Sequence, residues 1–548
     1  MKRSLILTSA TALTLALSGC LFGGGGGSGP FVAPVVVPPV VPPVVPPFTG
    51  VAALGEGGES LSSAEVENRY QVLKIGIDTS AGTLRLPLVS ADVESTFPFI
   101  WVANSGEGTI SKLNTKTGAE LGRYRTAPDG TAANPSRTTV DQDGNVWVGN
   151  RDGNTITKVG LKEFGQCVDR NGNGVIDTST GGTDVKGWTG PGLTGAADEC
   201  ILKHVALVAA GVTTPRDIRT VAIDPDNNVF VGGYSQNSIF KVNGATGAIL
   251  AAKQPDTLRS QGLYGGVVDK QGNLWSMSSG SGKVQKTSKD LLTTTLYDIG
   301  HAGYGIAIDK YGKVWTTEYG TRFSAFDSSD PVNTLKVFNQ TGAHGAQGIA
   351  TDDNGDIFIA GSLSGNTVGH YKQVFVNGVF SGVTFVANYT VGRGPTGVAV
   401  DGVGKVWATN YYSNSVSRIT LAANPANAAV DSYPVGLTPY NYSDMTGRVV
   451  RTITNRQGTW EAIFDGKRNG FSWGKVVWRL KGALPAGTSV VASVKAADTT
   501  VALGALDYVN VDNDKALAGV NGRYVKVRFR LTSGDNLSTP EINVIQIY

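Results

Sequence analysis

Residues 395–407 read PTGVAVDGVGKVW, and this stretch decides the fold. An apolar run ends at Asp401, a turn containing Gly404 follows, and a second apolar run ends in Trp407. An aspartate that opens such a turn accepts backbone N–H bonds, and glycine takes the left-handed position. The stretch therefore predicts a β-hairpin with an aromatic side chain at a fixed position on its second strand.

The same hairpin recurs along the chain. The further copies are TTVDQDGNVW (138–147), VAIDPDNNVF (221–230), GVVDKQGNLW (266–275), IAIDKYGKVW (306–315) and IATDDNGDIF (349–358). A half-copy at residues 97–113, FPFIWVANSGEGTISKL, puts Trp101 in the same position. Most copies are about 40–50 residues apart, the size of one four-stranded propeller blade. Seven aromatic positions predict an all-β fold with a seven-bladed β-propeller at residues 98–447.

The repeat P-x-G-[VI]-A-[VI]-D-x-x-G-x-V-W resembles that of the NHL and streptogramin (virginiamycin B) lyase propellers. In the lyase group the resemblance implies a catalytic His five residues before the Asp, a Glu on the next strand and a magnesium ion. Here no copy has the His, and only Glu318 matches the Glu, with Tyr304 in place of its His. His301 and His344 lie three residues before that position in adjacent copies. The lyase acid–base pair is therefore incomplete.

The ring requires a closing strand, because the first copy has no D-x-x-G strand before Trp101. A seventh D-x-x-G occurs far downstream, in PYNYSDMTG at residues 439–447. We expect Tyr440–Asp444 to form the inner strand of the first blade, beside Phe99–Val102. Such closure removes an exposed sheet edge.

The start of the chain resembles a bacterial lipoprotein signal. Lys2 and Arg3 precede an apolar stretch too short for a comfortable membrane span, and Leu17-Ser18-Gly19-Cys20 resembles a lipobox. Residues 1–19 are then a signal peptide and Cys20 is the lipidation site, although an ordinary secretory signal with a chance cysteine is the alternative. Residues 20–50, rich in Gly, Pro and Val, suit a spacer. Leu21 in place of Asp favours the outer membrane or cell surface, by analogy.

The gap between the second and third copies is twice the usual length and contains an insertion at residues 164–204. With Cys20 lipidated, Cys167 and Cys200 remain as a pair that would form a disulfide in an oxidising compartment. Between them lies a calcium-type loop with an oxygen ligand at every second position and a glycine at the sixth. Its expected ligands are Asp169, Asn171, Asn173, the Val175 carbonyl and Asp177, with Asp184 as a further carboxylate. The alternative is a hydrophilic loop without metal.

Outside the propeller we expect an N-terminal β segment at residues 51–97 and a β-sandwich at residues 448–548. Three tryptophans of the latter, Trp460, Trp473 and Trp478, suit either a sugar site or, more simply, the core. Charged residues are 17% of the chain and the net charge is +3, so there is no electrostatic reason to expect nucleic acid.

Two functional hypotheses remain. The first is a lipid-anchored, extracytoplasmic binding module for a protein or glycan, which is not an enzyme and has calcium only as a structural ion. The second is a lyase-like enzyme at the channel mouth, which would use Glu318 with His301, His344 and Tyr304 and would require magnesium. The missing catalytic His favours the first hypothesis.

Overall fold

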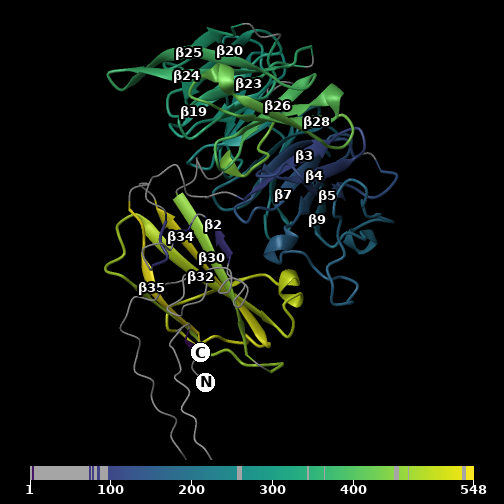
Figure 1. The fold of residues 1–548 in the computed structure, drawn as a ribbon, viewed down its shortest axis with the longest axis vertical. Coiled ribbons are helices and arrows are strands. Elements are labelled where there is room, and N and C mark those ends of the chain that lie inside the picture. Colours follow the sequence, from purple (N-terminus) through teal and green to yellow (C-terminus); the bar gives the residue numbers. More distant parts are fainter. Residues whose placement is uncertain are drawn as a thin grey trace, which may run out of the picture.

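The computed structural model describes residues 3–4, 73–75, 77–78, 83–86, 97–131, 133–255, 262–341, 345–362, 364–449, 456–466, 468–533 and 538–547. Cys20, the spacer at residues 20–50 and His344 lie outside the described residues. Figure 1 shows two domains, a propeller in blue to green and a sandwich in yellow. The N-terminal strand β2 lies with the sandwich, although it precedes the propeller in the sequence.

Seven antiparallel sheets built from the described residues are the blades. Blade 1 consists of β3 (Phe99–Asn104), β4 (Thr109–Asn114) and β5 (Glu120–Arg125). Blade 2 consists of β6 (Pro135–Val140), β7 (Val146–Asn150), β8 (Thr155–Val159) and β9 (Ile201–Ala206). Blade 3 consists of β10 (Ile218–Ile223), β11 (Val229–Gly233), β12 (Ser238–Val242) and β13 (Ile249–Lys253). Blade 4 consists of β14 (Gly265–Val268), β15 (Leu274–Met277), β16 (Lys283–Thr287) and β17 (Thr294–Asp298).

The remaining blades continue the same order. Blade 5 consists of β18 (Ile306–Ile308), β19 (Lys313–Thr317), β20 (Arg322–Asp327) and β21 (Lys336–Asn339). Blade 6 consists of β22 (Ile349–Thr351), β23 (Ile357–Ala360), β24 (Thr367–Val376) and β25 (Val379–Thr390). Blade 7 consists of β26 (Pro395–Val400), β27 (Val406–Asn410), β28 (Ser415–Thr420) and β29 (Ala429–Pro434). Short 3-10 helices are η1 (Lys162–Phe164), η2 (Leu193–Gly195), η3 (Tyr411–Ser413), η4 (Pro425–Asn427) and, in the sandwich, η5 (Ala502–Ala505).

The turn between the first two strands of a blade has the predicted chemistry. Asp401 Oδ1 accepts the backbone N–H groups of Val403 and Lys405 at 3.0 and 2.9 Å, and Gly404 has φ 81°. The aspartates of the five other copies accept the same two bonds: Asp141, Asp224, Asp269, Asp309 and Asp352. Each of these turns therefore satisfies two of its own backbone N–H groups locally.

The repeated aromatic residues form the interior of the blades. All seven are at most 1% exposed: Trp101, Trp147, Phe230, Trp275, Trp315, Phe358 and Trp407. In blade 7 the indole N–H of Trp407 donates to the second oxygen of Asp401 at 2.9 Å, and blades 4 and 5 have the same bond. One carboxylate thus stabilises both the turn and the adjacent aromatic.

The ring closes as the sequence predicts. The Tyr440 N–H donates to the Ala103 carbonyl at 3.1 Å, and the Trp101 N–H donates to the Met445 carbonyl at 3.0 Å. The segment at residues 439–445 therefore takes the place of the inner strand of blade 1. Asn441 is fully buried and its amide donates to the Trp101 carbonyl at 3.2 Å. A strand from the far end of the propeller thus ties its first blade to its last.

The second domain is a β-sandwich of two sheets. The five-stranded sheet has the order β2-β30-β34-β32-β33 and the three-stranded sheet β1-β35-β31. The strands are β1 (Arg3–Ser4), β2 (Leu73–Ile75), β30 (Arg456–Asp465), β31 (Val476–Leu480), β32 (Thr488–Ala497), β33 (Val509–Val511), β34 (Tyr524–Ser533) and β35 (Ile542–Ile547). Trp460 and Trp473 are at most 1% exposed, and Trp478 packs against the same core. The core role of the three tryptophans is confirmed.

Part of the segment at residues 51–97 belongs to this sandwich. β2 pairs with β30 in one sheet, and Leu84 forms a bridge with Ile542 of the other. The sandwich is therefore built from both sides of the propeller sequence, and the propeller is inserted into it.

A charged cluster joins the two domains. Asp143, in the first turn of blade 2, lies 3.2 Å from Arg530 and 3.6 Å from Arg528 of β34. Glu461 of β30 is 3% exposed and pairs with Arg528 at 2.6 Å and Lys526 at 2.7 Å. Both carboxylates of this cluster therefore have cationic partners from the sandwich.

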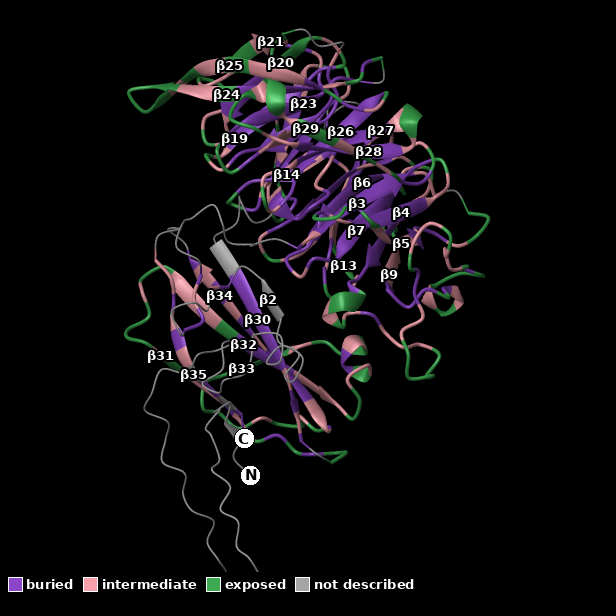
Figure 2. Cartoon of the chain, viewed as in Figure 1, coloured by how far each residue is buried: buried purple, intermediate pink, exposed green. Residues whose placement is uncertain are grey.

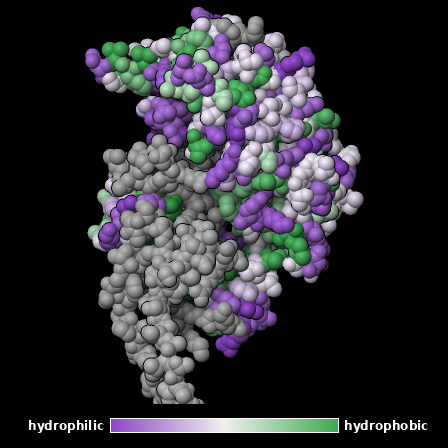
Figure 3. Space-filling view, viewed as in Figure 1, coloured by the Kyte–Doolittle hydropathy of each residue, from purple (hydrophilic) through white to green (hydrophobic). Residues whose placement is uncertain are grey.

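One hairpin projects from the propeller. β24 and β25 extend well beyond the other strands of blade 6, with their tip exposed (Figures 1 and 2). Figure 3 shows apolar residues gathered on this projection, where Val376 and Val379 are 57% and 69% exposed.

Candidate functional site

The innermost strands enclose a channel whose two ends differ. At the end where the D-x-x-G turns lie, a cavity of about 60 Å³ is lined mainly by aliphatic side chains of the innermost strands. Arg448 lies at this end, paired with Asp353 at 2.5 Å and donating to the Asp401 carbonyl at 2.6 Å. At the opposite end, called the mouth here, the innermost strands begin. A cavity of about 560 Å³ lies there beside blades 4 to 6.

The residues five positions before each repeat aspartate gather around the mouth. They are Ser136, Arg219, Tyr264, Tyr304, Gln347 and Thr396. The cavity beside them is lined by Ser279, Gly280, Ala302, Gly303, Tyr304, Glu318, Tyr319, Gly320 and Gln347. The mouth is therefore polar and aromatic where the other end is aliphatic, which suits a ligand site.

A cluster of tyrosines fills the channel below the mouth. The Tyr304 hydroxyl lies 2.6 Å from that of Tyr440 and 3.2 Å from that of Tyr264, and the Tyr304 and Tyr442 rings stack at 5.3 Å. All four are at most 8% exposed. Burial, followed by the neighbouring Tyr442 and Tyr440, raises the pKa of Tyr304 far above its usual value. Tyr304 is therefore a protonated hydrogen-bonding group and a poor base.

Three arginines surround this tyrosine cluster from blades 2 and 3. The guanidinium of Arg137 stacks 3.3 Å above the centre of the Tyr442 ring and 5.5 Å from that of Tyr264. Arg219 lies 5.0 Å from the Tyr264 ring centre, and Arg151 lies 5.3 Å from that of Tyr440. Sequence reasoning missed Arg137 and Arg151, because neither occupies the compared position. Arg219 does occupy that position, and from it the sequence could have indicated a basic group at the mouth.

Glu318 lines the cavity but its carboxylate is held in place. Oε1 accepts the backbone N–H groups of Thr321 and Arg322 at 3.1 and 3.0 Å, and the Arg322 guanidinium lies 3.0 Å from Oε2. Burial alone would raise the pKa of Glu318, but the hydrogen bonds and charge of Arg322 outweigh it and lower the pKa. Glu318 is therefore an ionised, clamped carboxylate.

His301 lies inside blade 5 and is 4% exposed. Its Nδ1 lies 2.7 Å from the Ala302 carbonyl, so Nδ1 donates, and Nε2 lies 3.1 Å from the Ser324 hydroxyl and 3.2 Å from that of Thr316. Burial is the main cause of a lowered His301 pKa. Both ring nitrogens are used in internal bonds, which favours a structural role. His344, its counterpart in the next blade, lies outside the described residues.

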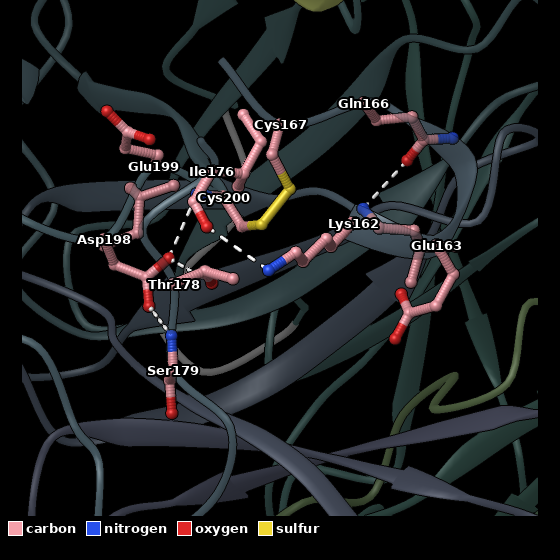
Figure 4. The surroundings of a disulfide bond; sticks show 12 residues. Lys162, Glu163, Gln166, Cys167, Ile176, Thr178, Ser179, Asp198, Glu199 and Cys200 are labelled. Carbon is pink, nitrogen blue, oxygen red and sulfur yellow. Dashed lines mark hydrogen bonds between the residues drawn. A yellow bond between two sulfur atoms is a disulfide. The ribbon is translucent and has the colours of Figure 1, made fainter. Parts of the chain in front are cut away.

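The insertion in blade 2 is closed by the Cys167–Cys200 disulfide. Figure 4 shows Asp198 beside it, accepting bonds from the Thr178 hydroxyl at 2.7 Å and the Ser179 N–H at 2.9 Å. The predicted disulfide is confirmed. Because Asp198 is 1% exposed and satisfied by these bonds, the insertion has a polar interior of its own.

The calcium-type loop is folded around its own oxygens. Asp169 accepts the N–H groups of Gly172 and Gly174 at 2.7 and 2.8 Å, and the Asn171 and Asn173 amides donate to Asp177 at 2.7 and 2.8 Å. The Val175 N–H donates to Asn173 Oδ1 at 2.9 Å. Asp184, in contrast, binds Thr180 and Lys186. The side chains of Asp169, Asn171, Asn173 and Asp177 thus close the loop on itself, and Asp184 has other partners.

Comparisons with known proteins concern the propeller. No family model matches the chain, and no curated protein does. Solved structures do resemble it. Virginiamycin B lyase from Staphylococcus aureus is 16% identical at a TM-score of 0.42, covering 58% of this chain and 90% of its own. A streptogramin B lyase is 14% identical at 0.42, covering 62% and 93%. Hydrazine synthase from Kuenenia stuttgartiensis is 14% identical at 0.43, covering 61% and 98%.

The described residues contain neither a metal-binding cluster of His, Cys, Asp and Glu nor a membrane-spanning helix. No group of three or more His, Cys, Asp and Glu side chains is arranged there to hold a metal ion. In the same residues no helix has the length and apolar character needed to cross a membrane.

Proposed function

We propose that the propeller is a binding module whose mouth holds a protein or glycan ligand without converting it. The supporting observation is that, among the described residues, the candidate bases of the mouth already have other partners. Tyr304 is buried and its pKa is raised, Glu318 is clamped by Arg322, and both nitrogens of His301 have internal partners. A general base has to reach the proton that it removes and have a pKa near the working pH.

The competing function is a lyase that uses Glu318 with His301, His344 and magnesium. Purified protein is incubated with magnesium and a type B streptogramin, and ring opening is followed by mass spectrometry. We expect no product. Ring opening that disappears in Glu318→Gln or His301→Ala would establish the enzyme and overturn the binding module.

Binding itself is tested at the cavity. Tyr319 is 54% exposed and its ring lies 5.4 Å from that of Tyr304, so it offers a face on which a sugar ring or an aromatic side chain can stack. Glycan arrays and a surface-protein screen are probed with wild type and Tyr319→Ala. Tyr311→Ala is the matched control, because Tyr311 is 48% exposed in a D-x-x-G turn, at the far end of the channel. We expect only Tyr319→Ala to lose binding, and equal losses in both variants would contradict the proposal.

The same proposal includes anchoring of the protein outside the cytoplasm through a lipid on Cys20. The Cys167–Cys200 disulfide supports an oxidising compartment. Processing before Cys20 would also remove β1, whose pairing with β35 is then available only to the unprocessed chain. Palmitate labelling and membrane fractionation of wild type and Cys20→Ser test the anchor. A soluble, unlabelled wild-type protein would refute it.

A further inference from the structure

A buried cation without a carboxylate partner lies under the mouth. Arg137 is fully buried, and two of its guanidinium nitrogens donate to the carbonyls of Ser136 at 2.8 Å and Tyr264 at 3.0 Å. The guanidinium also stacks on the Tyr442 ring, but its Nε has no hydrogen-bond partner and no carboxylate within the described part of the chain pairs with it. Burial of a charge is costly unless the charge is compensated. The uncompensated charge of Arg137 therefore calls for an explanation.

Two further arginines near Arg137 are partly exposed to solvent. The side chains of Arg219 and Arg151 are 15% and 21% exposed. Arg219 donates to Asp217 at 2.8 Å, but its buried NH1 has no partner. The Arg151 guanidinium donates to Asn134 Oδ1 at 2.5 Å and lies 3.8 Å from the exposed carboxylate of Asp152. Burial, followed by the positive charges of Arg219 and Arg137, lowers the pKa of Arg151, so the three groups are close enough to repel one another.

The charges at the mouth sum to a positive excess. Asp217 compensates Arg219, Asp152 compensates Arg151, and Arg322 compensates Glu318. Arg137 has no such partner among the described residues, so these groups together carry one excess positive charge. Guanidinium groups match the planar, two-oxygen geometry of a carboxylate, which also carries a single charge.

We propose that Arg137, Arg151 and Arg219 form an anion subsite that binds the carboxylate of an acidic sugar. This inference rests on the proposed function, because it names the ligand class of the same mouth. Arg219 and Arg151 touch the carboxylate, and Arg137 beneath them supplies the uncompensated charge. The sugar ring then extends over the tyrosine cluster toward the polar cavity at Tyr319 and Gln347.

The test is calorimetry on the full chain with three probes: D-galacturonate, its neutral match D-galactose, and inorganic phosphate. We expect D-galacturonate to bind about tenfold or more tightly than D-galactose, because a hydrogen bond to a charged group is among the stronger polar interactions. Arg219→Gln and Arg151→Gln each lose about tenfold in affinity for D-galacturonate and leave that for D-galactose unchanged. Lys310→Gln, which removes an exposed charge at the far end of the channel, is the control.

Each alternative result has a definite meaning. Equal affinities for the two sugars, both lost in Tyr319→Ala, would overturn the anion subsite and leave the binding module intact. Tighter binding of phosphate than of D-galacturonate would overturn the carboxylate assignment. Binding of no probe overturns the subsite, whereas the proposed function fails only if the glycan and protein screens are also negative. Arg219 and Arg151 are partly exposed, so the test does not depend on a variant of the buried Arg137.

Discussion

The two ends of the channel each contain a buried arginine, and the two arginines are in opposite electrostatic situations. Arg448 is 7% exposed and has both a carboxylate partner in Asp353 and a carbonyl partner in Asp401. Arg137 is fully buried, and its partners among the described residues are two carbonyls and the Tyr442 ring, without a carboxylate. The end with the compensated charge is lined mainly by aliphatic groups, as a core is. The difference is consistent with a structural role for Arg448 and with the ligand-binding role proposed for Arg137.

One segment of the chain contributes residues to both ends of the channel. Residues 439–449 run the length of the channel, from Tyr440 in the tyrosine cluster to Arg448 at the far end. A chain that ends at residue 438 is expected to lose more than about 5 kcal/mol of unfolding free energy, because it loses buried hydrogen bonds and ring packing together. Circular dichroism melting measures this, with a chain ending at residue 449 as the control. Equal melting of the two truncated chains would contradict the role of the segment.

The second prediction compares substitutions of the two buried arginines, Arg448 and Arg137. Arg448→Met is expected to lower the unfolding free energy by about 2 kcal/mol, because it strips a carbonyl and a carboxylate of their donor. Arg137→Met should change it by less than about 0.5 kcal/mol, since the loss of an uncompensated buried charge offsets the two lost hydrogen bonds. Urea unfolding of both variants compares them. A larger loss for Arg137→Met would show that its charge serves stability.

The third prediction concerns Glu461, a buried acid at the domain junction that has cationic partners. Burial alone would raise the pKa of Glu461, but Arg528 and Lys526 outweigh it and lower the pKa to about 2. Because the folded pKa lies below the ordinary value of 4.5, the stabilisation is complete above that value and is lost as the pH falls toward 2. The loss is at most about 3 kcal/mol. Melting from pH 5 to pH 2 should show it, and Glu461→Gln should flatten the dependence. An unchanged slope in that variant would assign the acid sensitivity to other groups.

The calcium-type loop gives the most local effect, because it lies in an exposed insertion. Calcium would replace the bonds that the Asn171 and Asn173 amides donate to Asp177, and the oxygens of Asp169, Asn171, Asn173, Val175 and Asp177 would turn to the ion. At a hundredfold excess over its dissociation constant it would stabilise the folded loop by about 2.7 kcal/mol. Calorimetric titration of wild type and Asp169→Ala measures binding. Asp184→Ala is the control, and the absence of heat with wild type refutes the site.

The sequence predicted the propeller well because its information is local. Asp401 forms its decisive bonds within four residues, so the repeat can be read directly, and Tyr440 was identified because it precedes a further copy of the same turn. The mouth was not predictable in this way. Arg137 lies next to the compared position, where β6 has an irregular register, and its isolation depends on which acids lie near it in space. The internal bonds of His301 likewise come from side chains of two other strands.

The pairing of β2 with β30 also orders events during synthesis. Ribosomes release a chain from its N-terminus, and domains generally fold as units while they emerge. β2 leaves the ribosome before the first blade, and β30 follows only after the last one. The propeller can therefore close before the final strands of the sandwich have been synthesised. A ribosome that stalls within the last hundred residues would leave a finished propeller attached to an unfinished sandwich, with β2 lacking its partner strand and accessible to chaperones and proteases.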